Sequence, residues 1–390
     1  MKKIAVVTAT RAEYGLLMPV IKELRKFESG EFKTELLVTG THLSEKYGMT
    51  IQEIEKNILR IDRQLPISVQ SDTELDISQN QAEALVKFTE LFAQKKYNAV
   101  VLLGDRYETL AIAIAAGNTR TPVFHLCGGD TTEGALDEWI RHSITKISYL
   151  HFVTNEESRR RVIQLGEAPG RVFNFGSTSI DNILHAADMT KEEALASVGL
   201  TDCRYVVCTF HPVTMESGGV EEQLESFLAA IQAFPKLQFI VTKSNADQGG
   251  AKINELLDQA AEKIISLHVF TSLGIRRYLS LMKYAEFILG NSSSGIIETP
   301  AFHVPTVNIG DRQRGRLQSA SIINCDANKD SIVSAIKIAL SEEHKKICKA
   351  VISPYGYGHA AEQIAKKSYE VVMNGGIDLK KKFFDLEFSL

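Results

Sequence analysis

Short hydrophobic runs alternate with amphipathic segments along the whole chain. The runs at residues 4–8, 35–39 and 99–103 are rich in valine, leucine and threonine, and a polar or glycine-containing loop follows each one. Between the runs, apolar residues recur every three or four positions, as in the segment 76–95. Continuous apolar runs are typical of buried parallel strands, and the intervening period is that of a helix. The pattern therefore predicts an α/β protein with parallel sheets covered by helices on both faces.

This alternation of strands and helices occurs twice. The first series ends with the run at 172–175 and a looser stretch from Gly176, and the second begins with the run at 205–210. We expect two Rossmann-like domains, over residues 1–176 and 177–390, with the last helix, at about 360–373, packing back on the first domain. Because polar loops follow the strands in both halves, two domains facing a cleft would bring these loops together.

A predicted helix that includes Asp137 and His142 carries the densest set of candidate catalytic groups. Asp137 and Arg141 are four residues apart, as are Glu138 and His142, so each pair shares a helix face. Asp105 lies in the loop after an earlier buried strand and would reach the same edge of the sheet. Two interpretations remain open. The charged groups either line a catalytic crevice or form surface ion pairs worth roughly a few tenths of a kcal/mol each.

Further residues after strand ends are candidates for binding an anion. Gly290-Asn-Ser-Ser-Ser-Gly295 lies between a strand and a helix, where N–H groups and hydroxyls bind phosphate, although a serine-rich helix cap has the same composition. Arginines follow strand ends at Arg11, at Arg106 and, at spacing two, from Arg312 onward, where they either bind an anion or are solvated. His211 follows the first strand of the second half and is either a ligand contact or a structural histidine.

Composition narrows the class of protein. Of 390 residues, 44% are hydrophobic, and the net charge of −4 argues against nucleic-acid and membrane-surface partners. The five cysteines lack C-x-x-C spacing and are typical of reduced cysteines. No apolar run approaches the ~20 residues that a membrane span needs, and the apolar run at the N-terminus is too short for a signal peptide. We therefore expect a cytoplasmic protein. No P-loop sequence and no metal-ligand spacing occurs, so no metal is expected.

Several motifs resemble those of the hydrolysing UDP-N-acetylglucosamine 2-epimerases. They are RAEYG (11–15), GTHL (40–43), GDRYE (104–108), GGDTTEGALDEWIRHSITK (128–146), HPVT (211–214), SNAD (244–247), GNSSSGIIE (290–298) and IGDRQRGR (309–316). The resemblance covers nearly the whole chain, and its most specific parts are the Arg-His-x-Ile-Thr-Lys and Gly-Asn-Ser-Ser blocks.

The resemblance implies a GT-B-type fold with UDP bound by the second domain, no cofactor, and a homodimer or homotetramer. The family converts UDP-GlcNAc and water to UDP and N-acetylmannosamine, the first step of sialic acid biosynthesis, by eliminating UDP to give a 2-acetamidoglucal and then adding water. Carried over by motif, the catalytic residues are Asp105, Asp137, Glu138, Arg141 and His211. The residues implied to bind the UDP-sugar are Arg11, His42, Arg106, Asn245, Ser292, Ser293, Glu298 and Arg312.

One position departs from the family pattern. Many members have glutamate in a His-x-Glu-Gly-Gly block, where this chain has Cys127. The departure leaves open which carboxylate is the base and which is the acid. It also leaves open a second substrate, a UDP-2,4-diacetamido-2,4,6-trideoxyhexose used for legionaminic acid. A more distant alternative is a GT-B glycosyltransferase, in which Asp137 and Arg141 would have no required role.

Overall fold

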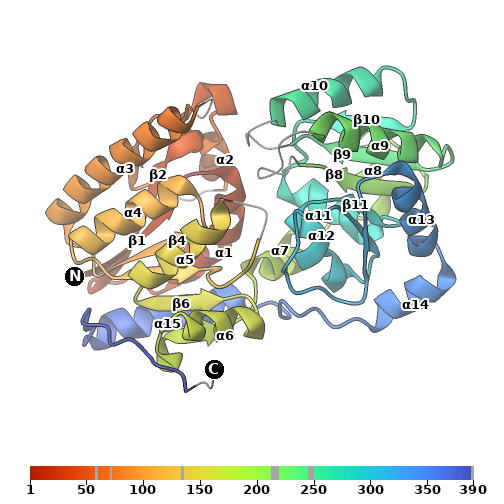
Figure 1. Ribbon diagram of the computed structural model, residues 1–390. Coiled ribbons are helices and arrows are strands. Elements are labelled where there is room, and N and C mark those ends of the chain that lie inside the picture. Colours follow the sequence, from red (N-terminus) through yellow and green to blue (C-terminus); the bar gives the residue numbers. More distant parts are fainter. Residues whose placement is uncertain (58–59, 71–72, 133–135, 212–218, 245–249, 388–390) are drawn as a thin grey trace. The chain divides into compact units, whose positions relative to one another are not determined.

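Two parallel sheets form the framework of the chain in the computed structural model (Figure 1). The structure describes residues 1–57, 60–70, 73–132, 136–211, 219–244 and 250–387. The chain forms two compact units: the first comprises Met1–Asp130, Asp137–Asp181 and Gly358–Leu390, and the second comprises Thr131–Leu136 and Asn182–Tyr357. Each unit has a sheet with helices on both faces, so the predicted α/β class is confirmed.

The first unit contains a seven-stranded parallel sheet. Its strand order is β3 (Arg63–Leu65), β2 (Phe32–Thr39), β1 (Lys2–Thr8), β4 (Ala99–Leu103), β5 (Val123–Leu126), β6 (Leu150–Val153) and β7 (Val172–Asn174). The chain builds β1 to β3 toward one edge and then returns to pair β4 with β1, with Val6 opposite Val101. The direction of winding therefore reverses between β1 and β4, which is where doubly wound sheets form a crevice at their carboxyl ends.

Helices cover the two faces of this sheet. Successive side chains of a strand point to opposite faces, so β1 supplies both cores. Ile4 and Val6 pack toward α1 (Arg11–Lys26), α2 (Ile51–Lys56) and α15 (Ala360–Asn374). Ala5 and Val7 pack toward α3 (Glu74–Lys95), α4 (Tyr107–Asn118) and α5 (Asp137–Ile147). Helix α6 (Glu156–Gln164) packs on β6 and β7.

Helix α15 comes from far along the sequence and packs on α1. Tyr369 of α15 stacks on Phe27, with ring centroids 4.5 Å apart. Beyond α15, the ammonium group of Lys381 lies 2.6 Å from the carboxylate of Glu167. Residues 358–387 are therefore an integral part of the first unit.

The second unit contains a six-stranded parallel sheet of the same design. Its order is β10 (Leu267–Phe270), β9 (Gln238–Thr242), β8 (Tyr205–Thr209), β11 (Ile288–Gly290), β12 (Thr306–Ile309) and β13 (Ile322–Cys325). One face packs on α9 (Val220–Gln232), α10 (Gly250–Ala261) and α13 (Lys329–Ala339), and the other on α8 (Lys191–Ala196) and α11 (Gly274–Tyr284). The remaining helices are α7 (Thr178–Ala186), which contains the boundary between the units, α12 (Ser293–Ile297) and α14 (Glu342–Ala350).

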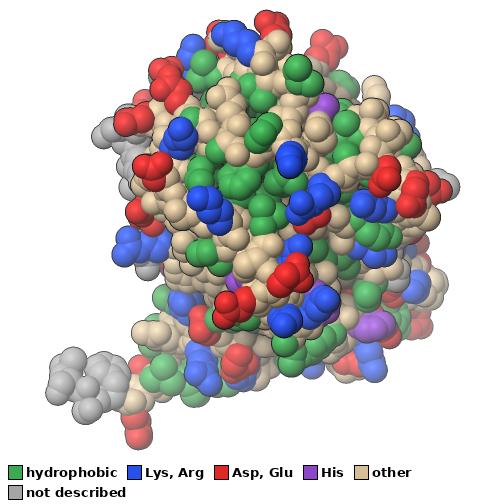
Figure 2. Space-filling view, turned by 90° about the vertical axis from the view of Figure 1, so that its right-hand side faces the viewer, with side chains coloured by type: hydrophobic (Ala, Val, Ile, Leu, Met, Phe, Trp, Pro, Cys, Tyr) green, Lys and Arg blue, Asp and Glu red, His purple; other side chains and the backbone are tan. Residues whose placement is uncertain are grey.

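The surface carries charges of both signs. Figure 2 shows lysine, arginine, aspartate and glutamate side chains interspersed over one face, with hydrophobic side chains gathered near its upper centre. Among the described residues, no helix combines the length and the apolar character needed to cross a bilayer.

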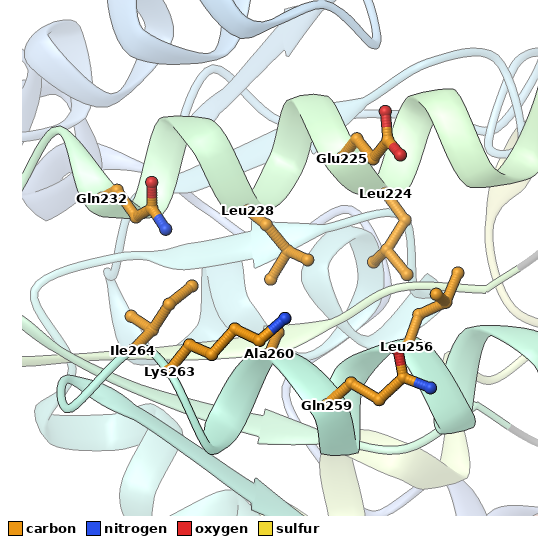
Figure 3. A pocket seen from close by; sticks show the side chains of 9 residues that line it. All are labelled: Leu224, Glu225, Leu228, Gln232, Leu256, Gln259, Ala260, Lys263 and Ile264. Carbon is orange, nitrogen blue, oxygen red and sulfur yellow. The ribbon is translucent and has the colours of Figure 1, made fainter.

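A groove of about 210 Å³ lies between α9 and α10 in the second unit (Figure 3). Leucine side chains of both helices, Leu224, Leu228 and Leu256, point into it, and the side chain of Lys263 extends into the space between the helices. No residue predicted from the sequence to act in a site lines this groove.

Candidate active site

The loop after β1 enters α1 through a capping box. Thr10 is the N-cap residue, and its hydroxyl accepts a hydrogen bond from the N–H of Glu13 at 3.4 Å. In return, the carboxylate of Glu13 accepts the N–H groups of Ala9 at 2.9 Å and Thr10 at 3.2 Å. These reciprocal bonds fix the start of the helix. Arg11, the first residue of α1, is partly buried and forms no ion pair within the described part of the chain, so its guanidinium is available to a ligand.

Arg141 connects α5 to the loop after β4. Its Nε donates to Asp105 at 2.7 Å, and its Nη1 donates to Glu138 at 2.9 Å and to the carbonyl oxygen of Asp130 at 2.8 Å. Burial lowers the pKa of Arg141, but the charges of Asp105, Asp130 and Glu138 outweigh it and raise the pKa well above the ordinary value. Arg141 is 1% exposed, so the alternative of a surface ion pair is wrong for this residue.

The predicted acidic residues of the first unit thus lie close together. The side chains of Asp105 and Glu138 are each about one-quarter exposed and share Arg141 as their hydrogen-bond donor. Asp137 is the first residue of α5, next to Glu138, and is exposed. His142 lies one turn further and approaches Glu138 at 3.1 Å. This group offers three neighbouring carboxylates that solvent can reach, and carboxylates are among the side chains that act as general acids and bases.

His125 holds the Asp105 loop from the neighbouring strand β5. Its Nε2 lies 2.7 Å from the carbonyl oxygen of Gly104, a residue whose φ of +80° turns the chain away from β4. Burial lowers the pKa of His125 to about 4, so the ring is neutral at pH 7 and Nε2 carries the proton that it donates. His125 was not among the predicted site residues.

Arg106 lies at the N-terminus of α4, where it is the N-cap residue. Its Nε donates to Glu108 at 2.7 Å, and its guanidinium lies 5.6 Å from the ring centroid of Tyr107. The side chain is one-third exposed, so the guanidinium of Arg106 is held by Glu108 on one side and is accessible to solvent on the other.

His42 follows β2 in a short 3-10 helix, Gly40–Leu43. The ring is fully buried, with Nε2 3.0 Å from the hydroxyl of Thr8 and Nδ1 2.8 Å from that of Thr50. Burial lowers the pKa of His42 to about 4, so it is neutral at pH 7. Both ring nitrogens form hydrogen bonds with threonine hydroxyls, and these bonds connect the end of β1 to the segment after β2.

In the second unit, His211 follows β8 and is fixed by Asn291. The Asn291 amide accepts the N–H of His211 at 2.7 Å and donates to its carbonyl oxygen at 2.8 Å. The ring nitrogen Nδ1 forms a hydrogen bond with the hydroxyl of Ser244 at 3.1 Å. Burial, together with the positive charge of Arg312, lowers the pKa of His211 to about 3. His211 therefore meets a ligand as a neutral ring.

The serine-rich stretch after β11 forms a helix start, as predicted, but the helix begins earlier than expected. It was expected near Gly295 and begins at Ser293, because the hydroxyl of Ser292 caps it by accepting the N–H of Ser294 at 3.4 Å. Ser292 and Ser293 are both partly exposed. Glu298 is the C-cap residue of this helix, which is only five residues long.

Two of the arginines after β12, Arg312 and Arg314, have different surroundings. Arg312 turns back to the serine-rich loop, with Nη1 3.2 Å from the carbonyl oxygen of Asn291, an oxygen that also accepts the amide of Gln313 at 2.9 Å. Arg314 is about two-thirds exposed and lies 3.6 Å from Asp311. Arg312 is thus placed beside the loop that holds the backbone of His211.

Three further positions complete the account of the predicted residues. Asn245 lies outside the described residues. Cys127 follows β5 with a φ of +64°, and its N–H donates to the carbonyl oxygen of Phe152. The carboxylate of Asp130 accepts the hydroxyl of Ser158 at 2.6 Å. Among the described residues, no group of three or more His, Cys, Asp and Glu side chains is arranged to hold a metal ion.

The sequence matches a known family over most of its length. A profile of the UDP-N-acetylglucosamine 2-epimerases matches residues 23–367. The chain belongs to the UDP-N-acetylglucosamine 2-epimerase family. The resemblance seen in its motifs is therefore confirmed.

Individual relatives in this epimerase family cover nearly the same span. The chain is 37% identical over 387 residues to the polysialic acid biosynthesis protein P7 of Escherichia coli, covering 99% of this chain and 98% of that protein. It is 38% identical over 329 residues to a GDP/UDP-N,N'-diacetylbacillosamine 2-epimerase (hydrolyzing) of Campylobacter jejuni, covering 84% and 85% of the two chains.

A solved structure shares the fold. The UDP-GlcNAc 2-epimerase of Neisseria meningitidis, solved bound to UDP-GlcNAc, superposes with a TM-score of 0.82 over 95% of this chain and all of that one, at 20% identity. The two parallel sheets thus belong to the same architecture as those of this epimerase.

Proposed function

We propose that this epimerase is of the hydrolysing type and converts UDP-GlcNAc and water to N-acetylmannosamine and UDP, the first step of sialic acid biosynthesis. The observation that carries the proposal is the buried Arg141, which gathers Asp105 and Glu138 at the carboxyl ends of the strands. The Escherichia coli relative, named for polysialic acid biosynthesis, supports the sialic acid step.

The proposed reaction has two stages. A base removes the proton on C2 while the bond from C1 to the UDP oxygen breaks, which leaves a 2-acetamidoglucal and free UDP. Water then gives a proton to the opposite face of C2 and its hydroxyl to C1. Proton transfers of this kind need carboxylates within hydrogen-bond reach of the carbon on each face.

We assign the proton transfers to Asp105 and Asp137. The hydrogen bond from Arg141 orients the carboxylate of Asp105, and Glu138 orients Arg141 from within the same helix. Holding a reacting group in one orientation removes part of the entropy cost of the transition state. Arg141 and Glu138 thus act on the reaction by keeping Asp105 in place.

We assign binding of the UDP group chiefly to the second unit. The hydroxyls and N–H groups of Ser292 and Ser293 and the guanidinium of Arg312 suit a departing diphosphate, whose charge grows as the bond breaks. Glu298 is assigned to the ribose hydroxyls. His211, being neutral, contributes hydrogen bonds and no charge. Arg11, Arg106 and His42 are assigned to the substrate side of the first unit, His42 by holding the loop ends.

A second candidate substrate is a UDP-2,4-diacetamido-2,4,6-trideoxyhexose. The observation that favours it is the Campylobacter jejuni relative, which is named as a hydrolysing diacetylbacillosamine 2-epimerase. The chemistry at C1 and C2 would be the same, so the two candidates differ only in the groups on C4 and C6 of the sugar.

Proton NMR of the purified protein with UDP-GlcNAc in deuterated water tests the proposal. The expected result is free UDP together with N-acetylmannosamine that carries deuterium at C2. UDP-N-acetylmannosamine without free UDP would overturn the hydrolysing assignment. If UDP-GlcNAc is unchanged but the diacetamido sugar nucleotide yields UDP and a C2-deuterated sugar, the second candidate holds.

A further inference from the structure

Two buried glutamates, Glu13 and Glu108, lie at the starts of the helices that follow the strands where the first sheet reverses its direction of winding. Strands β1 and β4 are adjacent and parallel, so the helices that follow them, α1 and α4, begin at the same edge of the sheet (Figure 1). Glu13 is the third residue of α1, and Glu108 is the second residue of α4. Neither glutamate was predicted from the sequence to act in the site.

Both carboxyl groups are buried and only half satisfied. Glu13 is 7% exposed and Glu108 is 3% exposed. One oxygen of Glu13 accepts the N–H groups of Ala9 and Thr10, and one oxygen of Glu108 accepts Arg106 Nε at 2.7 Å. The other oxygens, Oε1 of Glu13 and Oε2 of Glu108, are buried with no hydrogen-bond partner among the described residues.

Two ionised carboxylates in this arrangement would be costly. A buried acceptor without a donor destabilises the folded state, and two negative charges repel each other strongly where burial keeps water away. A single proton held by the pair removes one charge and turns one of the four oxygens into a donor. Pairs of buried carboxylates elsewhere solve the same problem by sharing a proton.

We propose that Glu13 and Glu108 share one proton, with Glu13 as the neutral partner, and that this pair positions Arg11 and Arg106 for the UDP-sugar. The inference rests on the proposed function for its substrate. Glu13 fixes the start of α1, where Arg11 is the first residue, and Glu108 holds Arg106 directly. Both glutamates are positioning residues, since they act through the arginines.

The electrostatic surroundings agree with this assignment. Burial and the charge of Glu108 raise the pKa of Glu13 to about 7, against the opposing effects of Arg106 and the two N–H groups. From the segment after β2, His42 faces the carbonyl oxygen of Thr10 but is neutral at pH 7 and adds no charge. Within the first turn of α1, Arg11 is the other charged residue.

The proton makes the site sensitive to alkaline pH. Since the pKa of Glu13 is raised, the neutral form is present below about pH 7 and is lost as the pH rises through that value. A single ionisation lowers the protonated fraction about tenfold for each pH unit above the pKa. The repulsion that follows would displace the two arginines, so the loss should appear in KM more than in kcat.

The test compares pH profiles of kcat/KM between pH 6 and 9. In the wild type, kcat/KM should be about 50-fold lower at pH 9 than at pH 7, because about half of the pairs hold the proton at pH 7 and about one in a hundred holds it at pH 9. Glu13→Gln keeps the shape and the hydrogen bonds of a neutral carboxyl but has no proton to lose, so its profile should stay flat over this range, whatever its absolute level. Glu157→Gln, at an exposed glutamate of α6, is the matched control and should follow the wild type. Coinciding profiles of the wild type and Glu13→Gln would overturn the proposal.

A measurement without turnover separates this proposal from the proposed function. Infrared difference spectra in deuterated buffer should show the carbonyl band of a protonated carboxylic acid at pH 6, which disappears toward pH 9 and is absent from Glu13→Gln. In Glu108→Gln the band should disappear at lower pH, because the charge that raises the pKa of Glu13 is gone. If the wild type shows the band but does not act on UDP-sugars, the proposed carboxyl pair stands and only the proposed function is overturned. Folded wild type without the band would overturn the pair.

Discussion

Asn291 holds the backbone of His211 with both ends of its side-chain amide, at 2.7 Å to the N–H and 2.8 Å to the carbonyl oxygen. The residues are 80 positions apart, at the ends of β11 and β8. The same device recurs nearby, where Asn254 accepts the N–H of Ser244 at 2.8 Å and donates to its carbonyl oxygen at 3.2 Å. Two asparagine side chains thus fix two loops that follow adjacent strands.

The Asn291 contact predicts the effect of Asn291→Asp. Aspartate can still accept the N–H of His211 but has no donor for the buried carbonyl oxygen, which should cost about 1–3 kcal/mol of the free energy of unfolding. We also expect kcat/KM to fall, because His211 and Arg312 both depend on the position of this residue. Urea denaturation and initial-rate kinetics provide the two measurements. Asn328→Asp, at the N-cap of α13 where aspartate caps equally well, is the control and should change neither.

Arg141→Lys should be severely damaging although it conserves the charge. An ammonium group cannot reproduce the three contacts of the guanidinium with Asp105, Glu138 and the carbonyl oxygen of Asp130. We expect a loss of roughly 3–5 kcal/mol in the free energy of unfolding, as for other broken buried ion pairs. A fall in kcat/KM of about 100-fold should accompany it, from misplacement of Asp105.

The matched control for Arg141→Lys is Arg276→Lys. Arg276 also pairs with an aspartate, Asp188, at 2.7 Å, but both side chains are more than half exposed. Ion pairs between exposed side chains contribute little to stability, so the stability and the rate of this variant should stay near those of the wild type. Equal behaviour of the two variants would remove the basis for assigning Arg141 a special role.

Asp137→Asn tests whether Asp137 transfers a proton at C2. If Asp137 transfers a proton at C2, the amide should lower kcat by about 10²–10⁴-fold while the protein stays folded, because the side chain is exposed. Deuterium incorporation at C2, followed by NMR, is the direct measurement. Asp188→Asn serves as the control. Unchanged incorporation in Asp137→Asn would transfer the role to another carboxylate.

Glu167 predicts acid-sensitive stability in the first unit. Burial raises its pKa, but hydrogen bonds from His151, Lys146 and Lys381 outweigh burial and lower the pKa from 4.5 to about 2. Because the folded-state pKa is depressed, the stabilisation is fully present above about pH 4.5 and is lost as the pH falls toward 2. Its size is on the order of 3 kcal/mol.

Lys381→Met should remove part of that contribution. The variant loses the contact of Lys381 with Glu167, and it also loses bonds to the carbonyl oxygens of Lys146 and Ser148 at the end of α5. We expect a lower melting temperature at pH 7 and a smaller decrease between pH 5 and 2, measured by calorimetry. Lys382→Met, at the exposed neighbouring lysine, is the control. Identical pH dependence in the wild type and Lys381→Met would contradict the assignment.

The strands of the fold could be predicted where both faces are buried. β4 spans Ala99–Leu103, the range given by its apolar run, because nothing polar interrupts a strand covered by helices on both faces. β3 was missed because it has only three residues, includes Arg63 and Gln64, and pairs with β2 alone at the edge of the sheet. β13 is likewise a short edge strand, of partly exposed residues.

The candidate site was predictable in its residue types and not in its partners. The charged residues lie on a helix, as expected, but Arg141 binds Asp105, 36 residues away, which no local spacing reveals. His125 and Asn291 act through backbone carbonyl groups and leave no signal of their own in the sequence. Glu13, by contrast, has a recognisable signal in the sequence, because Thr10-x-x-Glu13 is the pattern of a capping box.

The path of the chain through the two units has a consequence for synthesis on the ribosome. The second unit is built almost entirely from one continuous stretch, Asn182–Tyr357, whereas the first needs α15 to cover α1. During translation the second unit can complete its core while the apolar flank of α1 is still uncovered. A nascent chain stalled after Tyr357 would therefore expose this flank to chaperones and proteases. The first unit can complete its core only after α15 has been synthesised.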